Sequence, residues 1–116
     1  MLDDYLQEIG PQIHKLGFDC SVVAGGSYSY KYSLYRSLDE IRDIDLLIFF
    51  QTREDIVDFL TVHQQDLDKI LHLDEAEKHF NREDLKLLTL GHADAIRYSG
   101  QNTLGQKISA KIISYD

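Results

Sequence analysis

The chain has 116 residues, of which 43% are apolar and 28% charged, as expected of one folded domain rather than a disordered chain. Its formal net charge of −8 excludes a broad nucleic-acid surface, because neutralising phosphates needs clustered Lys and Arg. The longest apolar run, Leu46 to Phe50, is too short to cross a membrane, and the single cysteine, Cys20, favours a reducing cytoplasm.

Apolar residues at helical spacing predict a first helix from Leu2 to Leu16, with Gly17 as its stop. Pro11 interrupts this pattern, so we expect either a kink or two short helical pieces. Residues 18–24 then read as a short buried strand, which ends in Gly25-Gly26-Ser27.

The segment after the glycines has two interpretations. Tyr28, Tyr30 and Tyr32 alternate as on a strand, whereas Tyr28, Tyr32 and Tyr35 share one face of a helix that Ser27 could cap. We favour the helix, because a helix N-terminus following a glycine turn presents free N–H groups to phosphate. Residues 43–50 form the strongest strand pattern, apolar on both faces near its end as in an inner strand.

Capping residues and apolar spacing organise the second half of the chain. Thr52 and Asp55 form a capping signature before a run of apolar residues at helical spacing, which are Ile56, Phe59, Leu60, Leu67, Ile70 and Leu71. Asp74 and Asn81 look like caps of two more short helices, the second ending at Gly91. Residues 93–99 and 106–114 read as a hairpin.

The expected order is therefore α-β-α-β-α-α-β-β, an α/β (α+β) fold with a mixed sheet flanked by helices. We expect one domain over residues 1–116, either as a minimal protein or as the N-terminal part of a longer one.

Two motifs carry the chemistry. Glycines at a strand end let the backbone approach a ligand closely. Residues two apart on a strand point to the same face, so Asp43 and Asp45 project together while Ile44 points into the core. Adjacent carboxylates repel each other unless they share a cation. The cation usually bound at such a pair is Mg²⁺, which also bridges the phosphates of a nucleotide.

Together these motifs resemble the nucleotidyltransferase superfamily, which includes polymerases of the DNA polymerase beta type. Gly25, Gly26 and Ser27 match its small turn, and Asp43-Ile44-Asp45 matches its Asp-x-Asp strand. The interval between the motifs is similar to that in aminoglycoside and lincosamide nucleotidyltransferases. The likeness is carried by residues 18–50 and implies a nucleotidyltransferase-like sheet.

The resemblance implies a role for each matching residue. The turn would hold the phosphates of a nucleoside triphosphate, and Asp43 and Asp45 would bind Mg²⁺ or Mn²⁺ and act in catalysis. By their charge, Lys31 and Arg42 are further candidates for phosphate binding, with pairing to Asp39 or Glu40 as the alternative. The implied reaction moves a nucleotidyl group, AMP from ATP by expectation, to a hydroxyl of a small molecule or a protein. A homodimer is left open.

The superfamily also implies a third carboxylate on a later strand, and here the sequence departs from the pattern. At the matching place, residues 106–114 offer Ala110 or Lys111, and a lysine cannot ligate Mg²⁺. Asp94 and Asp116 are substitutes by position in the sequence. Two hypotheses follow: an active nucleotidyltransferase, or a module that has lost catalysis and serves in binding, regulation or assembly.

Overall fold

The computed structural model describes residues 2–24, 43–77 and 80–116. In chain order its elements are α1 (Leu2–Lys15), β1 (Cys20–Ala24), β2 (Asp43–Phe50), α3 (Arg53–Val62), α4 (Gln64–Ile70), β3 (Leu73–Glu77), α5 (Arg82–Thr89), β4 (Ala95–Asn102) and β5 (Lys107–Ser114). Among these described elements, no helix is both long and apolar enough to cross a membrane.

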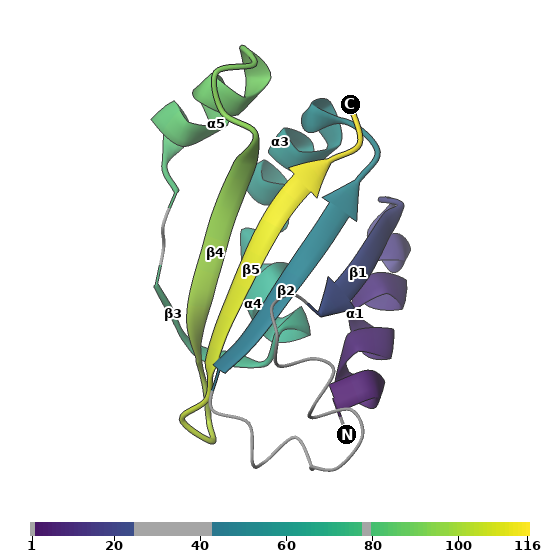
Figure 1. Cartoon of the computed structure of the whole chain (residues 1–116), viewed down its shortest axis with the longest axis vertical. Helices are drawn as coiled ribbons and strands as arrows, with labels where there is room; N and C mark the ends of the chain where they lie inside the picture. Colours follow the sequence, from purple (N-terminus) through teal and green to yellow (C-terminus); the bar gives the residue numbers. More distant parts are fainter. Residues whose placement is uncertain (1, 25–42, 78–79) are drawn as a thin grey trace.

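The strands form one mixed sheet in the order β1-β2-β5-β4-β3. The pair β2 and β5 is parallel, and the other neighbouring pairs are antiparallel. In Figure 1, α1, α3 and α4 lie behind the sheet, and α5 lies beyond the end where β4 begins. A mixed sheet flanked by helices confirms the predicted α+β class.

The core lies between the sheet and the three helices behind it. Along β2, alternate side chains from Ile44 to Phe50 are at most 3% exposed, and Ile56, Phe59 and Leu67 pack against them from α3 and α4. This alternation is the period of two that a strand imposes. The other face of the sheet carries no helix among the described residues, and we call it the open face.

Local signals in the sequence explain where several helices begin and end. The Thr52 hydroxyl accepts from the Asp55 amide at 3.1 Å, and Asn81 forms a capping box with Asp84, as predicted. Gly17 and Gly91 follow the ends of α1 and α5 with φ of 98° and 79°, the left-handed backbone that glycine adopts without strain.

Three predictions about helices need correction or qualification. Residues 73–77 form strand β3 rather than a helix capped by Asp74, because hydrogen bonding to the free edge of β4 overrides the helix propensity of this acidic segment. The helical run after Thr52 breaks at His63, which ends α3 and begins α4. Pro11 lies inside one continuous α1, so two separate pieces are excluded.

The hairpin at the end of the chain is confirmed, and the main difference from the prediction lies in the bounds of its first strand. Strand β4 continues through Gly100 to Asn102, and the turn is correspondingly shorter. The Asn102 side chain explains the turn, because its Oδ1 accepts from the amides of Leu104 and Gln106 at 3.0 and 2.9 Å. The predicted helix after Ser27 lies outside the described residues.

Candidate functional site

Asp43 and Asp45 open strand β2 and are both exposed on the open face of the sheet. Ile44 between them is 3% exposed and belongs to the core. The two carboxylates therefore project to the same face of the sheet, as predicted. The backbone positions of residues two apart on a strand are separated by roughly 7 Å, so the two carboxylates could share one cation if both side chains turn toward it.

The strand that precedes the glycine motif lies directly beside this pair. Strands β1 and β2 are antiparallel neighbours, and Ala24, the last residue of β1, pairs with Leu46 next to Asp45. The end of β1 and the start of β2 therefore lie side by side in the mixed sheet. The predicted phosphate-binding residues lie outside the described part of the chain; they are Gly25, Gly26, Ser27, Lys31 and Arg42.

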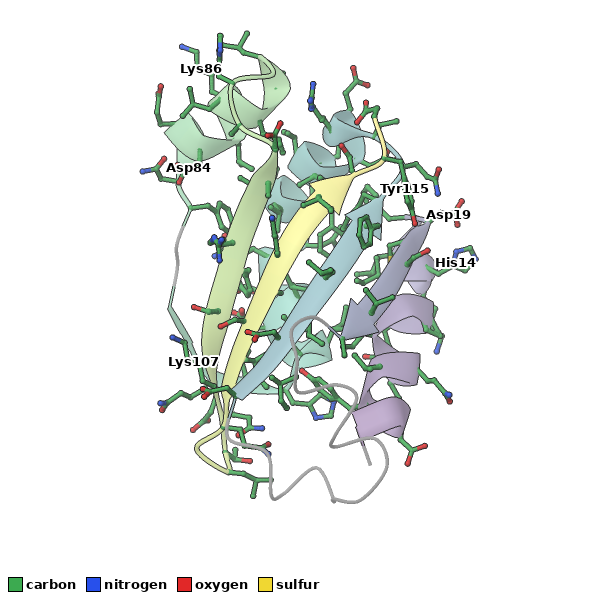
Figure 2. The ribbon with its side chains drawn as sticks, viewed as in Figure 1. His14, Asp19, Asp84, Lys86, Lys107 and Tyr115 are labelled. Carbon is green, nitrogen blue, oxygen red and sulfur yellow. The ribbon has the colours of Figure 1, made fainter. Side chains whose placement is uncertain are left out.

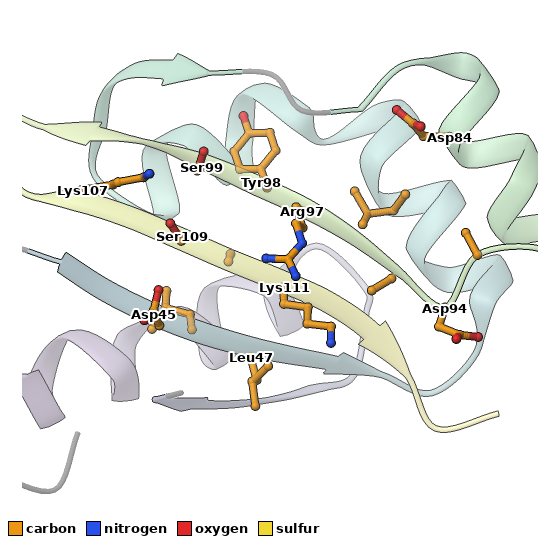
Figure 3. A pocket seen from close by; sticks show the side chains of 15 residues that line it. Asp45, Leu47, Asp84, Asp94, Arg97, Tyr98, Ser99, Lys107, Ser109 and Lys111 are labelled. Atoms are coloured by element: carbon orange, nitrogen blue, oxygen red, sulfur yellow. The ribbon is translucent and has the colours of Figure 1, made fainter. Parts of the chain in front are cut away.

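An open groove of about 790 Å³ runs across β2, β5 and β4. Its volume falls within the range typical of small-molecule sites. Figure 3 shows Asp45 at one end of the groove, Asp94 at the other, and Arg97 and Lys111 between them. Ser99 and Ser109 also line it.

The register of β2 and β5 shows which residue faces Asp45 across the sheet. Asp45 pairs with Ser109, Leu46 with Ala110, and Leu47 with Lys111. Ala110 is 3% exposed and lies on the helix-covered face, opposite to the carboxylates. Its expected place beside Asp43 and Asp45 was therefore wrong, because neighbouring residues of a strand point to opposite faces. Lys111 does lie on the open face, one strand repeat beyond Ser109.

Neither substitute for the third carboxylate lies beside Asp43 and Asp45. Ala95, which follows Asp94, is level with Phe49, so Asp94 is at least roughly 13 Å along the sheet from Asp45 and two strands away. Asp116 follows Tyr115 past the end of β5, and Figure 2 shows Tyr115 far from Lys107, which begins that strand. Metal ligands must lie within a few ångströms of one another.

Asp116 has a structural partner where it lies. Its carboxylate accepts from the Ser114 hydroxyl at 2.6 Å and from the Arg53 amide at 3.2 Å, at the first turn of α3. A carboxylate there satisfies a free N–H group and the helix dipole. Its position is explained without a metal.

The donor set fits Mg²⁺ that arrives with a nucleotide better than a permanently held ion. Within residues 2–24, 43–77 and 80–116, no group of three or more His, Cys, Asp or Glu side chains could hold a metal. Mg²⁺ commonly uses one or two carboxylates together with substrate phosphates and water. Asp43 and Asp45 satisfy that smaller requirement.

Sequence reasoning missed several residues of the groove. Ser109 and Lys107 belong to β5, and Arg97 belongs to β4. The available signal was the alternation of Lys107, Ser109 and Lys111 with buried residues of β5, which marks them as one polar face. Their position opposite Asp43, Asp45 and Leu47 depends on a strand pairing that alternation cannot supply.

A comparison with models of known protein families found no match, and neither did a comparison with curated proteins. The resemblance to nucleotidyltransferases therefore rests on the motifs of the chain itself.

Proposed function

We propose that this chain is a Mg²⁺-dependent nucleotidyltransferase that transfers AMP from ATP to a hydroxyl of a small molecule or protein. The observation that carries the proposal is the pair Asp43 and Asp45, exposed together on the open face at the start of β2. Strand β1 beside them leads in sequence to Gly25-Gly26-Ser27, the turn that the resemblance assigns to the phosphates.

In this reaction the acceptor oxygen forms a bond to the α-phosphorus while the bond from that phosphorus to the bridging oxygen breaks. Pyrophosphate leaves with the electron pair, and the acceptor proton passes to a carboxylate or to solvent. Mg²⁺, when bound, neutralises phosphate charge and orients the two oxygens. Asp43 and Asp45 would hold the ion, and the groove beside Asp45 offers room for the acceptor.

A second candidate is a module that binds the Mg²⁺–nucleotide without transferring it. The observation in its favour is the pairing of β2 with β5. This pairing puts the Ser109 hydroxyl opposite Asp45, and the cation Lys111 lies two residues farther along β5. A serine is a poor general base and a protonated lysine cannot ligate Mg²⁺. Neither residue can therefore supply the third carboxylate, and in a transferase the acceptor proton would pass to Asp43, to Asp45 or to solvent.

Release of pyrophosphate separates the two candidates. The protein is incubated with labelled ATP and Mg²⁺ or Mn²⁺, alone and with pools of hydroxyl-bearing small molecules and proteins. The transferase should release pyrophosphate and label an acceptor, and Asp45→Asn should reduce the rate by at least about a hundredfold, because it removes a metal ligand. Tight ATP binding without any release would favour the binding module.

A further inference from the structure

Two cations stand directly opposite each other in the groove. Arg97 of β4 and Lys111 of β5 are register partners, and both are exposed on the open face. Neither forms an ion pair with another described residue. Like charges directly opposite each other on a sheet are destabilising. The arrangement therefore favours an anionic ligand that would lie between or above the two side chains.

The carboxylates of the groove are placed where they do not neutralise this pair. Asp45 faces Ser109 one strand repeat away, and Asp84 is held in the capping box by the Asn81 amide, which donates to it at 2.7 Å. Asp94 is three residues from Arg97, roughly 10 Å along an extended strand. Among described side chains, the pair thus keeps its positive charge.

Lys107, the other cation among the described residues that line the groove, has a different neighbour. Lys107 is the register partner of Asp43, so a residue of opposite charge lies across from it. The contrast singles out Arg97 and Lys111 in a chain whose net charge is −8.

The donors match a phosphate group. A phosphomonoester carries a charge of roughly −1.5 to −2 near pH 7, which two cations balance. A carboxylate ligand carries a single negative charge and would need only one cation. A guanidinium presents paired N–H donors to phosphate oxygens, and a lysine adds a point charge. The Ser109 hydroxyl, one repeat along β5, can donate a further hydrogen bond.

The distance from the carboxylate pair sets the size of the ligand. Lys111 is two residues beyond Ser109, so it lies roughly 7 Å along the strand and about 4.8 Å across it from Asp45. A small phosphorylated molecule can span that interval. We propose that Arg97 and Lys111 bind the phosphate group of a phosphorylated small-molecule acceptor, whose hydroxyl then lies near Asp43 and Asp45; the acceptor role rests on the proposed function.

The first test uses inorganic phosphate without metal. Backbone amide shifts are followed by NMR during titration at constant ionic strength, for the parent, for Arg97→Gln with Lys111→Gln, and for Lys15→Gln with Lys69→Gln. The control pair is exposed on α1 and α4 and removes the same charge from the helix-covered side. Phosphate should perturb β4 and β5 in the parent, and the groove variant should weaken binding by about tenfold or more.

The control variant should bind phosphate within about twofold of the parent, because local contacts rather than net charge govern a specific site. Absence of binding to the parent, equal binding to the groove variant, or equal weakening in both variants would overturn the site. Folding of each variant is verified from the dispersion of its own spectrum.

The second test uses Mg²⁺–ATP with the same proteins. The groove variant should keep its affinity for Mg²⁺–ATP within about threefold, because the pair serves the acceptor. Loss of nucleotide and phosphate binding together would assign Arg97 and Lys111 to the triphosphate and overturn the acceptor role. Phosphate binding that depends on the pair, in a parent that does not bind Mg²⁺–ATP, would support the anion site and contradict the proposed function.

Discussion

At the scale of single residues, Cys20 shows how environment sets reactivity. Burial, together with the smaller effect of the negative charge on the neighbouring Asp19, raises the pKa of the Cys20 thiol to about 11. The thiolate is the reactive form, so the folded protein should resist alkylation. Cys20 is partly buried and packs against the core, so it acts as a small apolar side chain rather than as a reactive thiol.

The prediction is slow alkylation of native Cys20 by iodoacetamide at pH 8, on the order of a hundredfold below the denatured chain, whose thiol has a pKa of about 8.5. The native rate should climb steadily toward pH 10. Because the unfolded thiol loses its proton first, the stability from the protonated Cys20 is present below about pH 8.5 and declines above it. Equal native and denatured rates at pH 8 would contradict this account.

At the scale of elements, a buried hydroxyl joins α1 to the end of α4. Tyr5 is 7% exposed, and its hydroxyl donates to the Leu71 carbonyl at 2.8 Å. The last carbonyls of a helix lack partners within the helix, so this bond satisfies one of them. Burial also raises the pKa of the Tyr5 phenol, which keeps it in the protonated, donating form.

Tyr5→Phe should lower the free energy of unfolding by about 1–3 kcal/mol, because it leaves a buried carbonyl without its partner. Urea denaturation followed by circular dichroism measures the change. Tyr115→Phe is the matched control, since Tyr115 is 58% exposed and its ring stacks on Phe49 whether or not it carries a hydroxyl. A loss of stability as large in the control as in Tyr5→Phe would refute the role of the hydrogen bond.

Local signals in the sequence were sufficient for some elements and insufficient for others. The caps at Thr52 and Asn81 and the alternation of β2 act within a few residues, so the sequence predicted them correctly. Strand β3 was mistaken for a helix because its state depends on the free edge of β4, far along the chain. The break at His63 likewise interrupts an apolar pattern that continues on both sides.

At the scale of the whole molecule, strand order decides which residues meet. The same-face projection of Asp43 and Asp45 follows from strand periodicity, and the sequence was enough to predict it. Their neighbours Ser109 and Lys107 follow from the parallel pairing of β2 and β5, which no local pattern encodes. The open face thus gathers two carboxylates at one end and, farther along, the pair Arg97 and Lys111, which forms no ion pair with the residues that the structure describes.

The central claim is that Asp43 and Asp45 together bind nucleotide through Mg²⁺, and calorimetric or fluorescence melting tests it most directly. At about ten times its Kd, a ligand specific to the folded state stabilises by about 1.4 kcal/mol, which corresponds to a rise in Tm of roughly 5 °C. ATP with Mg²⁺ should give that rise in the parent and in a control, Glu54→Gln with Asp58→Asn, that removes two exposed charges from α3. Asp43→Asn with Asp45→Asn should abolish it. An equal rise in the Asp43–Asp45 variant, or no rise in the parent at millimolar Mg²⁺–ATP, would contradict the account.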